Sequence, residues 1–531
     1  MDPVLQTFNP ERTKNMHTYY NMDQLTLDLS TSFSPKENHV AVFINELVES
    51  LQINEPYLFG RPREYDLGAM MKLVLFAYTR ETFTSRKIER LAEENLYARW
   101  LTQERVPSYR TIARFCVSND VQELTNKGLT HLTEYLRARN LIDDALFIDG
   151  TKILADANKY SFVWKKNTIR FDQMNCEKLL LLMTELKEAY AVKEIPEGTF
   201  LTLDMVDELL TRMELRLEEI EKEVQSTKRI SPNPAKKQRR TLKSQVRKLT
   251  EKREKLIEHQ NQFSIYGARN SYSKTDHDAT FMRVKEDHMM NGQLKPAYNL
   301  QIATCNQFVL GYDVFQNPTD TRTLQPLLEK MNVTNQSHRY IVADAGYGSE
   351  SNYRYLEDEL PQHTALIPYG TFLKEKSKKW KTDEQKIMNW TYSEQEDYYI
   401  DPKGVRFNFH VYRKRTDKDG FIRDFKEYQA EKIDLNQEVI PAALTPKGYI
   451  RKITVNPAWE YHKAKQNELL STPETGKVYS RRKIDVETVF GFMKACLGFT
   501  RFTVRGLDNV RKQSGLLITA INMMKLAKIS N

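Results

Sequence analysis

Apolar side chains recur every three to four residues through the first part of the chain. They form one continuous face over residues 67–76 and a second over residues 88–96. This spacing is that of one side of an α-helix, because 3.6 residues complete a turn. The pattern therefore predicts a helical N-terminal domain over residues 1–140.

One short segment of this domain combines basic and aromatic side chains. Ser108 is the N-cap expected for a helix over residues 107–115. On that helix Tyr109, Arg110 and Arg114 would face outward, as on the recognition helix of a DNA-binding protein. An ordinary helix of a bundle would show the same pattern, so both interpretations stay open.

The hydrophobic pattern changes character twice further along the chain. Residues 202–259 carry two amphipathic stripes separated by a proline-containing break at 231–234, which predicts a helical hairpin insertion over residues 169–262. Residues 380–459 are rich in aromatic and β-forming residues with glycine-containing turns. They predict a β-rich insertion over residues 373–470.

Short apolar runs between these insertions are typical of β-strands. Residues 145–149 predict a buried strand, residues 297–304 and 308–315 a hairpin, and residues 339–344 a strand that follows a helix over 319–331. Such an alternation predicts an α/β domain with a mixed sheet. The segments that form it are residues 141–168, 263–372 and 471–531.

Composition adds a polyanion partner to this picture. The 531 residues carry a net charge of +9, and between Lys228 and Lys255 twelve Lys and Arg residues accompany only two acids. Clustered positive charge is typical of a surface that contacts nucleic acid, although a solvated helix face or an inert spacer would look similar. The cations expected to contact phosphates are Lys236, Lys237, Arg239, Arg240, Lys243 and Arg247.

Several protein classes are excluded by features that the sequence lacks. No apolar run approaches the length of a membrane span, and residues 1–10 lack the basic and apolar regions of a signal peptide. The four cysteines are isolated, which argues against a zinc module and a disulfide framework. We therefore expect a cytoplasmic protein without membrane contacts.

Three carboxylates, far apart in the chain, stand in settings suited to a metal ion. Asp149 and Asp344 each close an apolar strand, and Glu487 lies on an amphipathic helix. Rigidly held oxygen atoms suit a hard divalent cation, and two Asp with one Glu would suit a two-metal phosphoryl-transfer site. Most strand-end Asp residues cap turns instead. Among the other acids, Asp320 is more simply an acid in the first turn of a helix, where the dipole favours it.

The segments around these acids resemble those of the DDE transposases of bacterial insertion sequences. The resemblance is carried by residues 147–152 (FIDGTK), 343–348 (ADAGYG), 486–491 (VETVFG) and 501–507 (RFTVRGL). It implies an RNase H-like catalytic domain preceded by an InsH-type N-terminal domain, with a β-rich insert before the catalytic Glu. It also implies that Asp149, Asp344 and Glu487 are the catalytic and metal-binding triad. The implied cofactor is a pair of Mg²⁺ ions, for which Mn²⁺ could substitute.

The same family carries a signature of Tyr, Arg, Glu and Lys around the catalytic Glu. Lys494 fits its place, seven positions after the Glu. Upstream, the strict positions are held by Ser480 and Lys483, whereas the matching residue types, Tyr479 and Arg482, lie one place further from the Glu. The cation that contacts the terminal phosphate is therefore either Arg482 or Lys483.

Two tryptophans are candidates for contact with an unpaired base. Trp164 and Trp390 could each stack on such a base, as an aromatic side chain in this class of enzyme does when DNA forms a hairpin. Tryptophans in such positions are more often part of a core.

The resemblance implies a transposase that binds the terminal inverted repeats of an insertion sequence. Its partners would be double-stranded DNA, as element ends and as target, and a second copy of the chain in a homodimer on DNA. It would act in the bacterial cytoplasm in association with the nucleoid. A metal-dependent nuclease on the same fold and a domesticated, non-catalytic DNA-binding protein are the alternatives. The complete set of three carboxylates argues against the last of these.

Overall fold

The computed structural model describes residues 33–53, 64–190, 202–226, 233–285, 292–333, 338–433 and 438–530. Within it the chain divides into two compact units. One is formed by Met1–Phe115 together with Met523–Asn531, and the other by Cys116–Asn522.

The first unit is helical around one central helix, α3 (Leu67–Thr79). Every residue of α3 except Ala69 is buried, since the sequence offers almost no polar face, and Asp66 caps its first turn by accepting the Ala69 amide at 2.9 Å. The predicted helical N-terminal region is confirmed. The other helices of this region are α2 (Val40–Ser50), α4 (Ser85–Glu94), α5 (Leu96–Leu101) and α6 (Tyr109–Val117).

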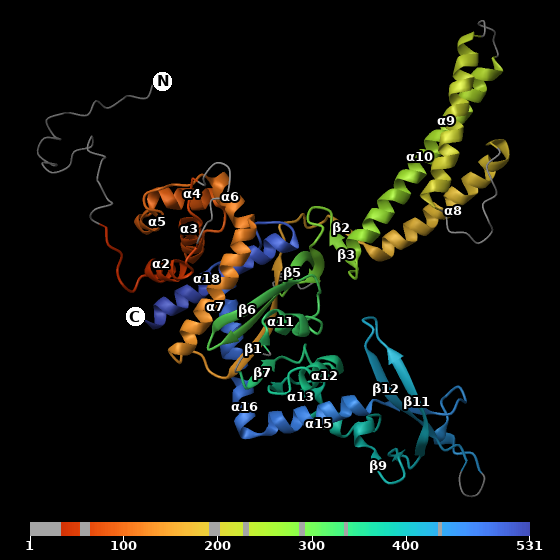
Figure 1. Cartoon of the computed structure of the whole chain (residues 1–531). Helices are drawn as coiled ribbons and strands as arrows, with labels where there is room; N and C mark the ends of the chain where they lie inside the picture. The colour runs from red at the N-terminus through yellow and green to blue at the C-terminus, as the bar shows by residue number, and fades with distance from the viewer. Residues whose placement is uncertain are drawn as a thin grey trace, which may run out of the picture. The chain divides into compact units, whose positions relative to one another are not determined.

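A six-stranded mixed sheet forms the centre of the second unit (Figure 1). The strands follow the order β4-β5-β1-β7-β8, with β6 also paired to β5. Pairing of β1 with β5 is antiparallel, and pairing of β1 with β7 and of β7 with β8 is parallel. The predicted α/β, RNase H-like class with a mixed sheet is confirmed. The strands are β1 (Ala145–Leu154), β4 (Thr280–Arg283), β5 (Leu294–Cys305), β6 (Phe308–Phe315), β7 (Tyr340–Ala343) and β8 (Thr364–Leu366).

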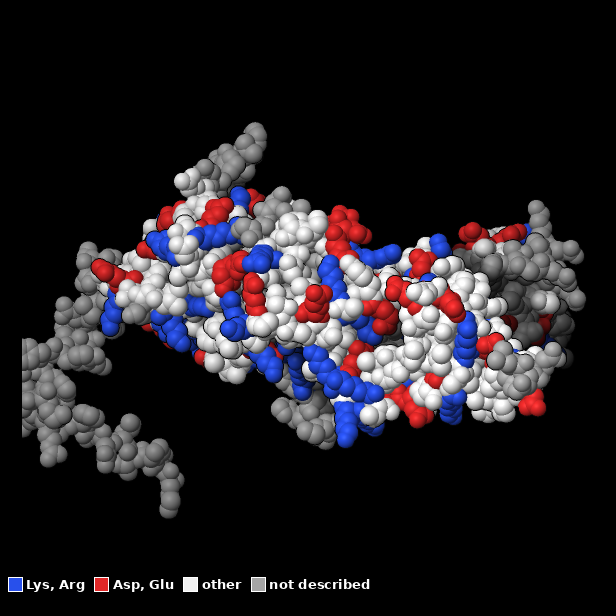
Figure 2. All heavy atoms as spheres, turned by 90° about the horizontal axis from the view of Figure 1, so that it is seen from below, with Lys and Arg blue, Asp and Glu red and all other residues white. Residues whose placement is uncertain are grey.

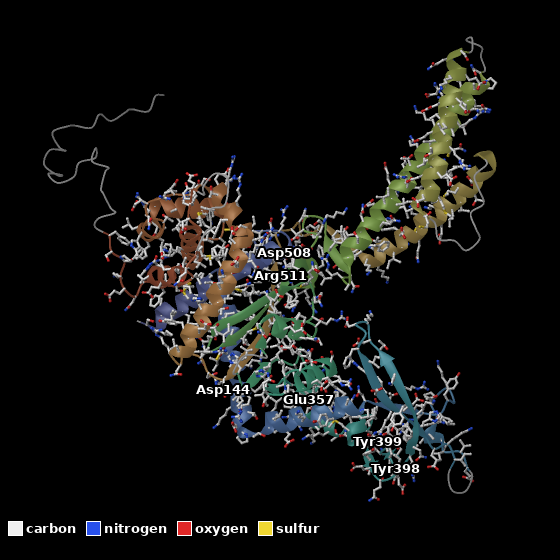
Figure 3. All side chains as sticks on the ribbon, viewed as in Figure 1. Asp144, Glu357, Tyr398, Tyr399, Asp508 and Arg511 are labelled. Carbon is white, nitrogen blue, oxygen red and sulfur yellow. The ribbon has the colours of Figure 1, made fainter. Side chains whose placement is uncertain are left out.

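Local sequence explains how the strands of this sheet begin and turn. Asn306 and Gln307 both adopt positive φ, which suits the tight turn of the β5–β6 hairpin that the sequence predicts. The carbonyl of Asp144, labelled in Figure 3, accepts the amides of Arg339 and Tyr340 and so holds the start of β7 against the start of β1. These contacts fix the register of β7 beside β1.

Helices cover this sheet and connect its strands. The helix predicted over residues 319–331 is shorter in the structure, where α11 spans Leu324–Lys330. Glu357 of α12 accepts Lys465 Nζ of α15 at 2.6 Å, which ties these two helices together (Figure 3). The helices are α7 (Asn119–Ala138), α11, α12 (Glu350–Asp358), α15 (Pro457–Ser471), α16 (Pro473–Ser480), α17 (Thr488–Gly491) and α18 (Leu507–Ile529), with two π-helical segments that flank α17.

Three long helices form an arm between the short strands β2 (Phe162–Trp164) and β3 (Ser271–Ser273). They are α8 (Lys165–Tyr190), α9 (Leu203–Ser226) and α10 (Pro234–Tyr266), and they lie along one another with a shared apolar core (Figure 1). The sequence predicts only α9 and α10. Helix α8 adds Leu179, Met183 and Leu186 to their core, but the run of leucines around them obscures its periodicity.

The β-rich insertion folds as a separate five-stranded antiparallel sheet in the order β13-β12-β11-β10-β9. Its small core gathers around Phe407 and Tyr428, against which Tyr399 of β10 packs edge to face (Figure 3). The strands are β9 (Thr391–Ser393), β10 (Tyr398–Ile400), β11 (Arg406–Thr416), β12 (Ile422–Ala430) and β13 (Lys452–Val455), and the short helices α13 (Phe372–Glu375) and α14 (Lys378–Lys381) precede them.

Candidate active site

Asp149 and Asp344 occupy matching positions on two neighbouring parallel strands. In the register of β1 and β7, Ile148 pairs with Ala343, so the two acids are the next residues along each strand. Asp344 directly follows the last residue of β7. Asp149 does not end β1, as the sequence suggested, because the strand continues to Leu154 through its pairing with β5.

Burial and the closeness of these two acids raise the pKa of one of them. Burial and, next, the negative charge of Asp344 raise the pKa of Asp149 to about 6. The Gly150 amide donates to Asp149 Oδ1 at 2.8 Å, and the Gly346 amide donates to Asp344 Oδ1 at 2.7 Å. Each carboxylate thus accepts a backbone amide of its own segment, but the pair carries more negative charge than its surroundings compensate.

Arg482 connects the third acid to this pair. Its Nη1 lies 3.2 Å from Asp149 Oδ2, and its Nη2 lies 3.6 Å from Glu487 Oε1. The Arg482 side chain is only 12% exposed, whereas that of Glu487 is 54% exposed. One guanidinium therefore contacts carboxylates that are far apart in the sequence.

Tyr479 completes this group of side chains. Arg482 hydrogen-bonds to it, and burial raises the pKa of its hydroxyl, with smaller contributions of the same sign from Asp344 and Asp149. Tyr479 is thus within electrostatic range of both strand acids. Ser480 and Lys483, which hold the strict positions of the signature, are both exposed.

A π-helix explains why the residue types and the strict spacing disagree. Residues Lys483–Glu487 form a π-helical segment rather than the regular α-helix that the sequence predicts. A π-bulge inserts one additional residue into a helix and often occurs at functional sites. Compared with the strict spacing of the signature, the additional residue lengthens the interval between Arg482 and Glu487 by one. It leaves the two side chains in the same positions relative to each other. A second π-helical segment, Phe492–Cys496, contains Lys494.

Buried polar contacts hold this irregular helix against the sheet. Asp485 Oδ1 accepts the Thr304 hydroxyl at 2.7 Å and the Gln307 amide at 2.9 Å. Lys494 Nζ donates to the Lys152 carbonyl of β1 at 3.2 Å. The anchoring role of Asp485 is not apparent from the sequence, since an acid two residues before the Glu on a helix is ordinarily exposed.

The other candidate residues lie on separate elements. Arg110 and Arg114 are exposed on α6, and the cations named on α10, from Lys236 to Arg247, are exposed as well. Nothing in the described structure places any of them beside the three acids.

The two tryptophans pack against neighbouring aromatic rings. Trp164 lies 6.0 Å from Phe281, between ring centroids. Trp390 packs on Phe407 and donates its Nε1–H to the Glu384 carbonyl at 2.8 Å. Both rings are therefore partly engaged in packing, and base stacking by either remains a prediction.

The three acids supply oxygen ligands of the kind that hard divalent cations prefer. Among the described residues, however, no three His, Cys, Asp or Glu side chains already stand in metal-binding geometry. Arg482 instead lies between Asp149 and Glu487 and provides positive charge there. The donor set thus fits a divalent cation in its chemistry, although Arg482 pairs with Asp149 and Glu487 in this structure.

Comparison with known proteins identifies the class. A family model described as "Transposase DDE domain" matches residues 269–523, and one described as "Transposase domain (DUF772)" matches residues 30–118. Asp149 lies outside both ranges, but β1 pairs with β5 and β7, which lie within the first. The chain belongs to the DDE transposases of insertion sequences.

Two relatives match part of the chain. It is 29% identical over 112 residues to the "Probable transposase for insertion sequence element ISH11" from two strains of Halobacterium salinarum. That stretch is 21% of this chain and 33% of each relative, so the chain spans about a third of their length. No solved structure matches the chain. Among the described residues, no helix is long and apolar enough to cross a membrane.

Proposed function

We propose that this protein cuts DNA at the ends of an insertion sequence and joins the released 3′ ends to target DNA. The observation that carries the proposal is that Asp149 lies beside Asp344 on the neighbouring strand, while Arg482 bridges Asp149 and Glu487. Two acids side by side serve no evident purpose in stability, because like charges oppose folding.

The three acids would hold the metal ions of the reaction. Divalent ions bound there would neutralise the phosphate and stabilise the attacking and leaving oxygens of an in-line displacement. Asp149 must lose its proton to act as a ligand, and its raised pKa of about 6 still leaves it largely ionised at neutral pH. We assign the same role to Asp344 and Glu487.

The neighbouring basic and hydroxyl groups would hold the DNA. When Arg482 no longer pairs with Asp149, its planar fork suits two oxygens of one phosphate. Tyr479 would orient this guanidinium through their hydrogen bond. Lys494, fixed to β1 at Lys152, would supply a point charge to a phosphate further along the strand.

Helix α10 would contact DNA outside the active site. Its exposed cations carry no base-reading pattern, so they would add affinity for the backbone of any sequence. Over the face seen in Figure 2, basic and acidic side chains are interspersed. Joining two DNA ends requires two active sites, and we therefore expect a homodimer on DNA.

The decisive experiment is a cleavage and strand-transfer assay with Mg²⁺ and DNA that carries the element ends. Wild-type protein should release and join the ends, whereas Asp149→Ala, Asp344→Ala and Glu487→Ala should each lower both rates by at least about 10³-fold and still bind DNA. Cleavage without joining would indicate a nuclease. DNA binding without cleavage by the wild type would indicate a non-catalytic protein.

A further inference from the structure

A fourth carboxylate, Asp320, lies beside the strand that carries Asp149. Lys152 Nζ donates to its Oδ1 at 2.8 Å and to its Oδ2 at 3.2 Å. Asn299 Nδ2 and Gln301 Nε2, both on β5, donate to the same Oδ1 at 2.7 and 3.0 Å. Asp320 precedes α11 by four residues, so the first-turn role that the sequence suggests is wrong.

The two amide partners of Asp320 belong to a buried network that also includes Tyr347. Asn299, Gln301 and Tyr347 have no exposed surface. Gln301 accepts the Tyr347 hydroxyl at its Oε1 and donates through Nε2 to Asn299 and Asp320. Buried polar networks of this kind stabilise one arrangement strongly, because an unpaired member is costly.

Gly150 shows how closely this network approaches Asp149. Gly150 follows Asp149 and pairs with Gln301 across the strands. A Cβ at Gly150 would lie 2.0 Å from Gln301 Nε2 and 3.0 Å from Asp320 Oδ1. Only glycine leaves room for the amide of Gln301, so the network lies directly against the backbone that carries the acid.

The segment after Asp320 is bonded to the loop of the second acid. Thr321 Oγ1 donates to the Gly346 carbonyl at 2.9 Å, two residues after Asp344. Asn352 Nδ2 donates to the carbonyls of Thr321 and Tyr347 at 2.9 and 2.7 Å. The chain at 320–321 is therefore connected to both acid-bearing segments.

We propose that Asp320 is a positioning residue that holds Asp149 and Asp344 side by side, against their mutual repulsion, through Gln301, Tyr347 and Thr321. The proposal rests on the proposed function, since it assumes that the pair receives divalent ions. Asp320 itself is matched by Lys152 and two amides, so it has no uncompensated charge to offer a metal. In this it differs from Asp149, whose charge is poorly compensated.

The test compares Mn²⁺ binding by the full-length protein, measured by calorimetry without DNA, across stability-matched variants. Tyr347→Phe removes one buried hydroxyl from the network. Tyr353→Phe is the control, because the Tyr353 hydroxyl is also buried and donates to the Ile367 carbonyl at 2.8 Å, outside the network. Removing a partner that orients a metal ligand typically weakens metal binding 10- to 100-fold.

We expect Tyr347→Phe and Asp320→Asn to weaken Mn²⁺ binding about tenfold, and Asp320→Ala more, because Asn keeps one acceptor for Asn299 and Gln301. Tyr353→Phe should bind Mn²⁺ as the wild type does while losing a similar amount of thermal stability. Equal Mn²⁺ affinity in Tyr347→Phe and Tyr353→Phe would overturn the positioning role. A wild type that binds no Mn²⁺ and cuts no DNA would instead overturn the proposed function.

Discussion

At the scale of single residues, the main feature of the candidate site is the negative charge that its acids bring together. Two carboxylates on adjacent strands repel each other, and the partial burial of Asp149 limits the screening of its charge by water. Arg482 relieves part of this repulsion from one side, while the backbone amides of Gly150 and Gly346 relieve another part. Burial and the remaining repulsion from Asp344 together raise the pKa of Asp149.

This raised pKa predicts that Asp149 destabilises the metal-free protein at neutral and alkaline pH. The folded pKa is about 6 and the ordinary value is 3.8, so the favourable protonated form is lost as pH rises through about 6. Asp149→Asn should therefore be more stable than the wild type by roughly 3 kcal/mol at pH 8 and by about half of that at pH 5. Calorimetric unfolding at both pH values, without divalent ions, measures the difference. A stability gain that does not change with pH would contradict the assignment.

Arg482 and Lys483 give a second prediction at this scale. Because Arg482 contacts two of the acids and Lys483 is exposed, Arg482→Ala should slow cleavage about 10²-fold or more and Lys483→Ala only a few-fold. Arg482→Lys should not restore the rate, since one ammonium cannot replace a planar fork. Cleavage rates on DNA with element ends decide between them. A larger loss of cleavage rate in Lys483→Ala than in Arg482→Ala would instead indicate that Lys483 contacts the terminal phosphate.

At the scale of elements, the sequence predicts the helices and strands that have a regular hydrophobic period. It misses those whose pattern is irregular or whose extent depends on pairing. The β5–β6 hairpin follows from two apolar runs around Asn306, and the helical N-terminal region follows from regular spacing. Helix α8 is not predicted, because its leucines are consecutive. The length of β1 is underestimated, because the second half of the strand depends on pairing with β5. Local pattern contains no information about such distant partners.

The residues of the candidate site also divide into those that the local sequence pattern predicts and those that it misses. Two of its acids are apparent as charges that follow apolar strands and the third as a Glu on an amphipathic helix, and the resemblance joins the three into one set. The identity of the phosphate-contacting cation is not apparent, because a π-helix and an α-helix have the same apolar pattern over one turn. The roles of Asp485 and Asp320 are missed for a related reason: their partners on β5 and in the β5–β6 turn meet them only once the sheet has formed.

The π-helix itself gives a prediction. Deleting Ile484, which is 65% exposed, removes one residue from the bulge and should restore an α-helix with Arg482 and the Glu at the same place. Cleavage should then stay within about tenfold of the wild type, because the turns on either side keep their orientation. Deleting the exposed Ala464 from the regular helix α15 is the matched control, since it rotates the following residues by about 100° and should unfold the region or abolish activity. Equal damage from both deletions would show that the additional residue is not a bulge.

At the scale of the whole molecule, insertions are attached through narrow stems. The arm begins and ends at β2 and β3, which pair with each other, and Thr168 near its start bonds Gln262 and Tyr266 near its end. Its core is built from its own three helices. Such an insertion can be changed without altering the sheet that carries the acids.

We therefore predict that the arm can be replaced. Substituting a short Gly–Ser linker for residues 169–262 should leave the unfolding temperature of the remainder nearly unchanged and lower DNA affinity at low salt for all sequences. Reversing only Lys237, Arg240 and Lys243 should flatten the dependence of log affinity on log salt by about one unit for each phosphate that the arm no longer neutralises. Titrations at several salt concentrations measure both effects. Unchanged affinity in both variants would make the arm a spacer.

Helix α18 has a consequence for how the chain is made. Its residues up to Asn522 belong to the second unit, while Met523–Asn531 belong to the unit that begins at the N-terminus. During translation the N-terminal unit emerges first, yet it lacks one of its parts until this late segment has left the ribosome. The first unit to be synthesised thus completes its folding only after the sheet that carries the acids has been made.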